Sequence, residues 1–178
     1  MKLIIDIEHR TCRLEISDTE SYKAPFFDTW RDILTSHEEG VIDTIKVMGY
    51  HKDKKDLFTE VVTLGASKCK KLDISDNYLK SDAIAIVSIL RTSTTIEEID
   101  LANNSIKDSG TEVLTRLQLV INLKKLNISN NWVRHLDGHK VDELFDTHPS
   151  LVLDVSDNSS DFKIIGSTGE YGAEHLIM

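Results

Sequence analysis

The chain has 178 residues, of which 40% are hydrophobic and 29% are charged, and its formal net charge is -9. This length suits one domain, and the composition is that of an ordinary folded protein, neither fibrous nor disordered. The negative charge disfavours nucleic acid and anionic membranes as partners, because affinity for phosphate groups depends largely on Lys and Arg. Two cysteines exclude a disulfide framework, and no run of 18 apolar residues predicts a membrane helix.

The first 41 residues contain two short runs rich in β-branched residues and one amphipathic segment. Residues 1–7 and 12–16 predict a β-hairpin or two neighbouring strands, which would cap the structure that follows. Behind Pro25, apolar residues recur every three or four positions and predict a helix: Phe26, Phe27, Trp30, Ile33 and Leu34. The N-terminus lacks a basic stretch followed by a long apolar one, so we expect a soluble protein without a classical signal peptide.

A nine-residue pattern then recurs at a constant interval. It reads CKKLDISDN at 69–77, IEEIDLANN at 96–104, LKKLNISNN at 123–131 and SLVLDVSDN at 150–158. An imperfect copy precedes these four, with Ile42, Ile45 and Val47 in the apolar positions and Tyr50 in place of the asparagine. Its following helix, with Leu57, Val61 and Leu64, fits only if one residue is inserted. The run LEISDT (14–19) also mimics LDISDN and predicts a diverged first copy in that alignment.

The second half of each copy predicts a helix. A small residue lies six places after Asn77 and Asn104 and is followed by apolar pairs at helical spacing, namely Ala83, Ile86, Val87 and Leu90 in one copy and Gly110, Val113, Leu114 and Leu117 in the next. With the pattern LxxLxLxxN, this arrangement resembles leucine-rich repeats of the long, ribonuclease-inhibitor-like type. The interval between copies, about 27 residues, lies in the range of that repeat class.

The resemblance implies an α/β fold: a leucine-rich repeat solenoid, a right-handed β/α superhelix with a parallel sheet on its concave side and helices on its convex side. We expect one domain over residues 1–178, with an N-terminal cap and diverged repeat at 1–41, repeats at 42–158 and a C-terminal cap and tail at 159–178. Pro149 ends the last helix, and Phe162, Ile164 and Ile165 predict a closing strand before a partly mobile tail.

Within each strand, alternate residues are predicted to serve different purposes. Inward residues such as Leu72 and Ile74 build the core, and a structural ladder of asparagines is expected to pair buried backbone groups: Asn77, Asn104, Asn131 and Asn158. Outward residues are left free by the fold in this interpretation, and they form our candidate partner-binding set: Lys46, Met48, Lys71, Asp73, Ser75, Glu98, Asp100, Lys125, Asn127 and Asp154.

The column formed by Lys46, Asp73, Asp100, Asn127 and Asp154 indicates an acidic strip that receives Lys or Arg side chains of a partner protein with a basic surface. The alternative is that these polar residues only keep an exposed sheet soluble. The resemblance implies a non-catalytic, cytoplasmic protein-binding module or scaffold, monomeric on its own. Two further hypotheses are a subunit of a larger assembly and a bacterial effector that acts on a protein in a host cytoplasm.

No catalytic, cofactor or metal site is expected. His135 and His139, with Asp137 between them, have a metal-like spacing near a predicted helix start, but they lack a fixed further ligand. Cys69 occupies the position of Ile96 and is interpreted as a buried hydrophobe, and HKDKKD (51–56) as a solvated loop. The competing hypothesis is activation of a GTPase through Arg134 on a rim loop.

Overall fold

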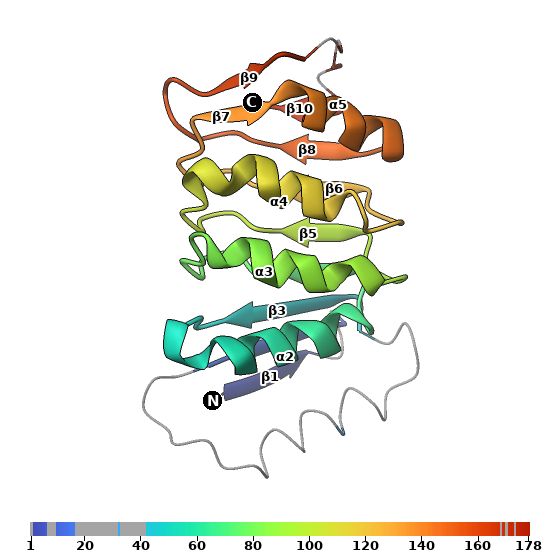
Figure 1. The fold of residues 1–178 in the computed structure, drawn as a ribbon. Coiled ribbons are helices and arrows are strands. Elements are labelled where there is room, and N and C mark those ends of the chain that lie inside the picture. Colours follow the sequence, from blue (N-terminus) through green and yellow to red (C-terminus); the bar gives the residue numbers. More distant parts are fainter. Residues whose placement is uncertain are drawn as a thin grey trace.

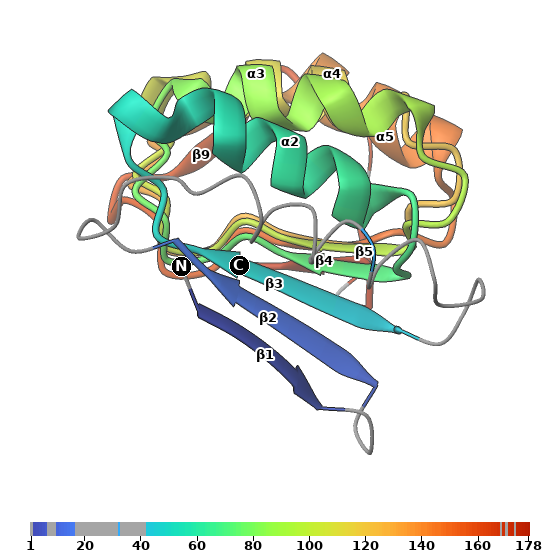
Figure 2. The same cartoon turned by 90° about the horizontal axis from the view of Figure 1, so that it is seen from below.

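The computed structural model describes residues 2–6, 10–16, 32, 42–167, 169, 171–172 and 174–178. These residues form a mixed α/β structure in which a mostly parallel sheet carries a layer of helices on one face (Figure 1, Figure 2). The apolar residues of the helix predicted over Phe26 to Leu34 lie outside the described residues; within that range only Asp32 is described, and it is helical and exposed. Within the described part, no helix combines the length and the apolar character needed to cross a membrane.

The main sheet follows the chain almost in order. Its strand order is β1-β2-β3-β4-β5-β6-β8-β10, and only β1 and β2 are antiparallel. The predicted hairpin is therefore confirmed. The strands are β1 (Lys2–Asp6), β2 (Thr11–Glu15), β3 (Thr44–Met48), β4 (Lys71–Asp73), β5 (Glu98–Asp100), β6 (Lys125–Asn127), β8 (Val152–Asp154) and β10 (Leu176–Ile177).

Helices return the chain from the end of one strand to the start of the next. Because their apolar residues recur at helical spacing, each presents one face to the sheet; α4 buries Gly110, Val113, Leu114 and Leu117. The described helices are α2 (Lys55–Ala66), α3 (Asp82–Ser88), α4 (Gly110–Leu117) and α5 (Gly138–Thr147), with short 3-10 turns η1 (Lys52–Lys54), η2 (Ile89–Thr92) and η3 (Lys107–Ser109).

The core lies between the two layers and is one continuous apolar cluster. The middle residue of each short strand points into it, and Leu72, Ile99, Leu126 and Leu153 are at most 2% exposed. A fully buried side chain of this size contributes about 1.5 to 3 kcal/mol. Since each strand supplies only one or two such residues, stacking of successive strand–helix units is what closes the core.

The N-terminal part departs from the predicted alignment in its register. Cys12 pairs with Ile45 and Leu14 pairs with Val47 across β2 and β3. Because Ile45 in turn pairs with Leu72, Leu14 corresponds to Ile74 in the next copy rather than to Leu72. The alignment based on LEISDT was wrong by two residues. A slip of two keeps the same side chains on the inner face, so the alternation in the sequence does not detect it.

The first described helix also differs from its prediction. Phe58 and Val61 are buried in the way that Ala83 and Ile86 are buried one copy later. An uninterrupted repeat would instead place Asp56 and Thr59 at these two positions, so the insertion is two residues long instead of one. It is accommodated by η1 and the first turn of α2, and the segment predicted to be a charged loop, HKDKKD (51–56), is therefore largely helical.

The C-terminal end contains elements that the repeat pattern did not indicate. β7 (His135–Asp137) precedes α5 and pairs in parallel with β9 (Lys163–Ile165), so the predicted closing strand exists but lies outside the main sheet. The chain end was expected to be partly mobile, yet β10 adds to the edge of the main sheet beside β8. Gly138 allows the segment that follows β9 to pass close to the start of α5, because a Cβ at residue 138 would lie 2.0 Å from the backbone nitrogen of Ser167.

Candidate functional site

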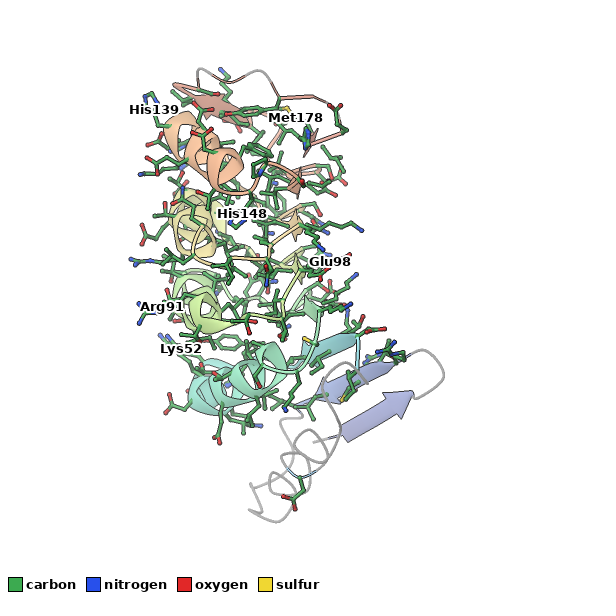
Figure 3. The ribbon with its side chains drawn as sticks, turned by 90° about the vertical axis from the view of Figure 1, so that its right-hand side faces the viewer. Lys52, Arg91, Glu98, His139, His148 and Met178 are labelled. Atoms are coloured by element: carbon green, nitrogen blue, oxygen red, sulfur yellow. The ribbon has the colours of Figure 1, made fainter. Side chains whose placement is uncertain are left out.

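The outward residues of five parallel strands form one straight column on the sheet face opposite the helices. Lys46 pairs in register with Asp73, Asp73 with Asp100, Asp100 with Asn127, and Asn127 with Asp154. The structure thus brings together all five residues of the predicted central column. Glu98, on the same sheet face, lies on the opposite side of the molecule from Lys52 and Arg91 on the helix side (Figure 3). We call this surface the sheet face.

At the β3–β4 end of the column, the negative charge of Asp73 is neutralised by Lys46 of the same column. The Lys46 ammonium lies 2.9 Å from Asp73 Oδ2 and donates a second hydrogen bond to the Ser75 hydroxyl at 3.1 Å. The Asp73 side chain is only 16% exposed. Asp73 is therefore committed to an internal ion pair with Lys46, which the sequence alone did not indicate, and the acidic recognition strip stays a prediction.

The two neighbouring carboxyls, Asp73 and Asp100, differ in pKa. Burial tends to raise the pKa of Asp73, but hydrogen bonds from Ser75 and Lys46 outweigh it and hold the pKa below its ordinary value. Burial raises the pKa of Asp100, and the nearby negative charge of Asp73 raises it further, while the backbone hydrogen bond from Ala102 only partly opposes the shift. Among the described residues, no Lys or Arg forms an ion pair with Asp100.

The column residues also support the backbone where the strands end. Oδ1 of Asp100 accepts the N–H of Ala102 at 3.1 Å, and Oδ1 of Asn127 accepts the N–H of Ser129 at 2.9 Å. Asp73 and Asp154 make the same bond to the residue two positions later. Such local side-chain bonds are typical of turns that begin with Asp or Asn. The expectation that the outward residues are unnecessary for the fold was therefore wrong for this column.

The column beside it carries alternating charge. Lys71, Glu98 and Lys125 are in register, and Lys125 Nζ lies 3.1 Å from Glu98 Oε1. Toward the β8 end, the sheet face holds a shallow depression of about 250 Å³. Its polar lining consists of Lys71, Glu98, Asp100, Lys125, Asn127 and Asp154.

Two predicted residues contribute little to this surface, and two others were missed. Ser75 is only 7% exposed and hydrogen-bonds to Asp73, while Met48 is half-buried on β3 next to the strand end. Arg13 on β2 pairs in register with Lys46 and extends the central column, and Glu15 pairs with Met48 and forms a further column with it. Alternation within CRLEI indicated that they point outward, but only the pairing of β2 with β3 placed them in these columns.

The asparagines lie behind the strand ends and form a continuous hydrogen-bond ladder. Asn104 is fully buried; its Oδ1 accepts the N–H groups of Asn77 and Leu79, and its Nδ2 donates to the carbonyl oxygens of Ile74, Leu101 and Ala102. Asn77, Asn131 and Asn158 make equivalent bonds in their own copies. The ladder fixes the spacing of the strands that carry the candidate site.

The residues weighed for metal or thiol chemistry are placed apart from this site. His135 is exposed on β7 and His139 is exposed on α5, so the two histidines lie on different elements. Asp137 accepts the backbone N–H of His139 instead. Over the described residues, no three His, Cys, Asp or Glu side chains are placed to hold a metal ion. Cys69 is buried as predicted, and burial raises the pKa of its thiol to about 12.

Arg134, the residue of the GTPase hypothesis, is paired within the chain. Its guanidinium donates to both carboxylate oxygens of Asp108, at 3.1 and 3.3 Å, and both side chains are largely exposed. No protein-family model matches the chain, and no curated protein matches it. The function of the chain must therefore be inferred from its own geometry.

Proposed function

We propose that the chain is a leucine-rich repeat solenoid of the ribonuclease-inhibitor-like type and that it functions as a non-catalytic protein-binding module. The recurrence of LxxLxLxxN supports the family assignment, and so do the asparagine hydrogen bonds that join residues 27 positions apart. A parallel sheet with one face buried under helices leaves the other face available over several strands. Such a face is broad and shallow, which suits a protein surface better than a small molecule.

We further propose that the half of the sheet face from β5 to β8 binds the partner. The observation that carries this proposal is the difference between Asp73, which is neutralised by Lys46, and Asp100 and Asp154, which form no ion pair with any cation of the described residues. The raised pKa of Asp100 means that burial and the charge of Asp73 outweigh the stabilisation of its ionised form by the Ala102 N–H and by Lys71 and Lys46. A cation from a partner would add to that stabilisation.

The spacing of the two carboxylates defines the partner chemistry. They lie two strands apart, with Asn127 between them, which corresponds to about 10 Å. A basic partner surface would place one Lys or Arg against each carboxylate and a hydrogen-bond donor against the Asn127 amide oxygen. The Lys125–Glu98 pair beside the column would then form part of the polar rim.

Capture of partners from a cell lysate, followed by mass spectrometry and measurement of Kd for the captured protein, tests the proposal. The variant to compare is Asp100→Asn with Asp154→Asn. Asparagine keeps the Oδ1 acceptor that supports the strand end, and Asn127 already demonstrates that arrangement. Since a hydrogen bond to a charged group contributes about 1.5 to 3 kcal/mol, the double variant should weaken binding at least about tenfold.

A matched control changes the net charge equally on the helix side. Asp56 and Asp146 are exposed on α2 and α5, so Asp56→Asn with Asp146→Asn should leave binding within about twofold. Both double variants should melt as cooperatively as the parent chain. Equal binding by the parent and the Asp100/Asp154 variant would exclude this half of the sheet face.

A further inference from the structure

The loops that leave β4, β5 and β6 lie together along one side of the molecule, at the left in Figure 1. Each loop is hydrogen-bonded to the next: Lys80 N–H donates to the Asn104 carbonyl at 2.8 Å, and Lys107 N–H donates to the Asn131 carbonyl at 2.9 Å. We call this surface the strand-exit edge and define it by Tyr78, Lys80, Ser105, Lys107, Trp132 and Arg134.

The strand-exit edge carries a column of cations. Lys80, Lys107 and Arg134 follow the first three ladder asparagines by three positions, and all three are exposed; Asp161 occupies this position after Asn158. Their backbones are one strand spacing apart, about 5 Å. Arg134 pairs with Asp108, but neither Lys80 nor Lys107 has a carboxylate within ion-pair distance in the part of the chain that the structure describes. Two lysines without an ion-pair partner among the described residues therefore lie in neighbouring loops of a chain whose net charge is -9.

Two large aromatic side chains lie in the same loops. Tyr78 and Trp132 each follow a ladder asparagine directly, and each residue is 64% exposed. Their backbones are left-handed, with φ of 57° and 59°. The turn imposes this conformation, since Ser105 at the same position of the intervening copy has φ of 55°. Bulky residues are uncommon there, and serine serves the turn as well.

Neither ring is explained by packing in the core. The ammonium of Lys80 lies over the Tyr78 ring, 4.5 Å from the ring centre. Lys80 therefore lies on the surface beside an aromatic side chain that is still largely exposed. A depression of about 350 Å³ lies between Tyr78 and Lys107, with Lys80 and Asp108 in its wall, and Asp108 is the residue that pairs with Arg134. Exposed Tyr, Trp and Arg are the residue types enriched where binding energy concentrates in protein interfaces.

We infer that the strand-exit edge is a second interaction surface and that it binds an extended acidic segment of a partner protein. Carboxylates spaced along such a segment would pair with Lys80 and Lys107, and its apolar side chains would cover the rings of Tyr78 and Trp132. A long polyanion fits less well than a short segment, because its charge would continue past Lys80 and Lys107 toward exposed Asp76 and Asp157 in the neighbouring turns. The strand-exit edge differs from the sheet face in that its groups without an ion-pair partner among the described residues are lysines, whereas those of the sheet face are Asp100 and Asp154.

The probe is a short fluorescent peptide of alternating glutamate and phenylalanine, titrated with the full chain. Its glutamine counterpart and a short oligothymidylate are titrated in parallel. Lys80→Gln with Lys107→Gln should weaken binding of the acidic peptide at least about tenfold, since two charge-assisted contacts are lost. Tyr78→Ser with Trp132→Ser should weaken it similarly, and Ser105 indicates that serine is compatible with the turn.

The control is Lys68→Gln with Lys70→Gln, which removes two positive charges where the chain enters β4. This pair should leave the affinity within about twofold. Asp100→Asn with Asp154→Asn should not weaken binding of the acidic peptide either. Failure of this inference can therefore be distinguished from failure of the proposed function of the sheet face. The inference would be overturned if the acidic and glutamine peptides bound equally, or if both lysine double variants lost the same affinity for the acidic peptide. It would also be overturned if the oligothymidylate bound more tightly than the acidic peptide through Lys80 and Lys107.

Discussion

Asn104 and Asp100 lie four positions apart in one copy of the pattern, and both positions recur in the neighbouring copies, but they belong to regions with different physical demands. Asn104 is fully buried and joins two successive copies of the pattern through its side-chain amide. Asp100 is half-buried on the sheet face and makes one backbone hydrogen bond. In the ladder, every copy makes the same contacts. On the sheet face, the contacts change from strand to strand.

This contrast shows how recurrence in the chain should be interpreted. Few residues can replace a buried ladder amide, because the backbone N–H groups that donate to it would lose their partner. A residue at the strand end of the sheet face needs only an oxygen at Oδ1 to accept the backbone N–H, so both Asp and Asn occur there and the charge is free to vary. The charge of these residues therefore carries more information about function than the recurrence of the pattern does. The ladder and the sheet face should respond differently to substitution.

The largest effect is expected for Asn104→Ala. It removes the acceptor of two buried N–H groups, those of Asn77 and Leu79, while the carbonyls of Ile74 and Leu101 keep bonds from Asn77 and Asn131. At about 1 to 3 kcal/mol for each of the two unpaired donors, the free energy of unfolding should fall by about 2 to 6 kcal/mol. Urea unfolding measures this change, and an unaltered midpoint would refute a structural ladder.

A smaller effect is expected for Asn158→Ala. Asn158 accepts the N–H groups of Asn131 and Val133, but it is only partly buried. Water can replace part of its hydrogen bonding, so the loss should be about 1 to 2 kcal/mol in the same urea experiment. A loss as large as that of Asn104→Ala would mean that burial does not set the strength of the ladder.

On the sheet face, Asp73→Asn should lower stability near neutral pH. The pKa of Asp73 lies below its ordinary value, so its ionised form stabilises the fold above that value, and this contribution disappears as pH falls through the lowered pKa. Loss of the part-buried pair with Lys46 should cost about 1 kcal/mol. Thermal melting at neutral and acidic pH measures it, and the two proteins should converge once the carboxyl is protonated.

Asp100→Asn should have the opposite sign and the smallest magnitude. The pKa of Asp100 is raised, chiefly by burial and also by Asp73, so its ionised form destabilises the folded chain at neutral pH. Removing the charge should raise Tm slightly there, with no difference at a pH below the ordinary value of 3.8, where the carboxyl is protonated folded and unfolded. A lower Tm at neutral pH would show that Asp100 has a stabilising partner.

The central copies were predictable because their constraints are local and repeated. The spacing of Leu72, Ile74 and Asn77 within one copy is that of a short strand followed by a turn, and its return at 96–104 and 123–131 predicted neighbouring parallel strands. The ends were less predictable. The two-residue insertion before Phe58 and the pairing of β7 with β9 each occur once, so no repetition in the sequence exposes them.

For the candidate sites, the sequence indicated which residues point outward but not what they contact. The pairing of Lys46 with Asp73 depends on side chains that meet across β3 and β4, and the placement of Arg13 depends on the register of β2. The strand-exit edge was missed in the same way, although Lys80, Lys107 and Arg134 recur at the period of the pattern. Comparing the residues three positions after each ladder asparagine would have revealed these cations.

The period, the inward apolar residues and the ladder asparagines thus follow from the sequence without further information, because periodicity and burial are properties of one chain segment at a time. Which charges cancel and which remain is settled only by folding. Lys46 neutralises Asp73, Arg134 pairs with Asp108, and Asp100 is left without a cation among the described residues. The physical reason is distance: electrostatic contacts act over a few ångströms, and only folding brings residues 27 positions apart within that range.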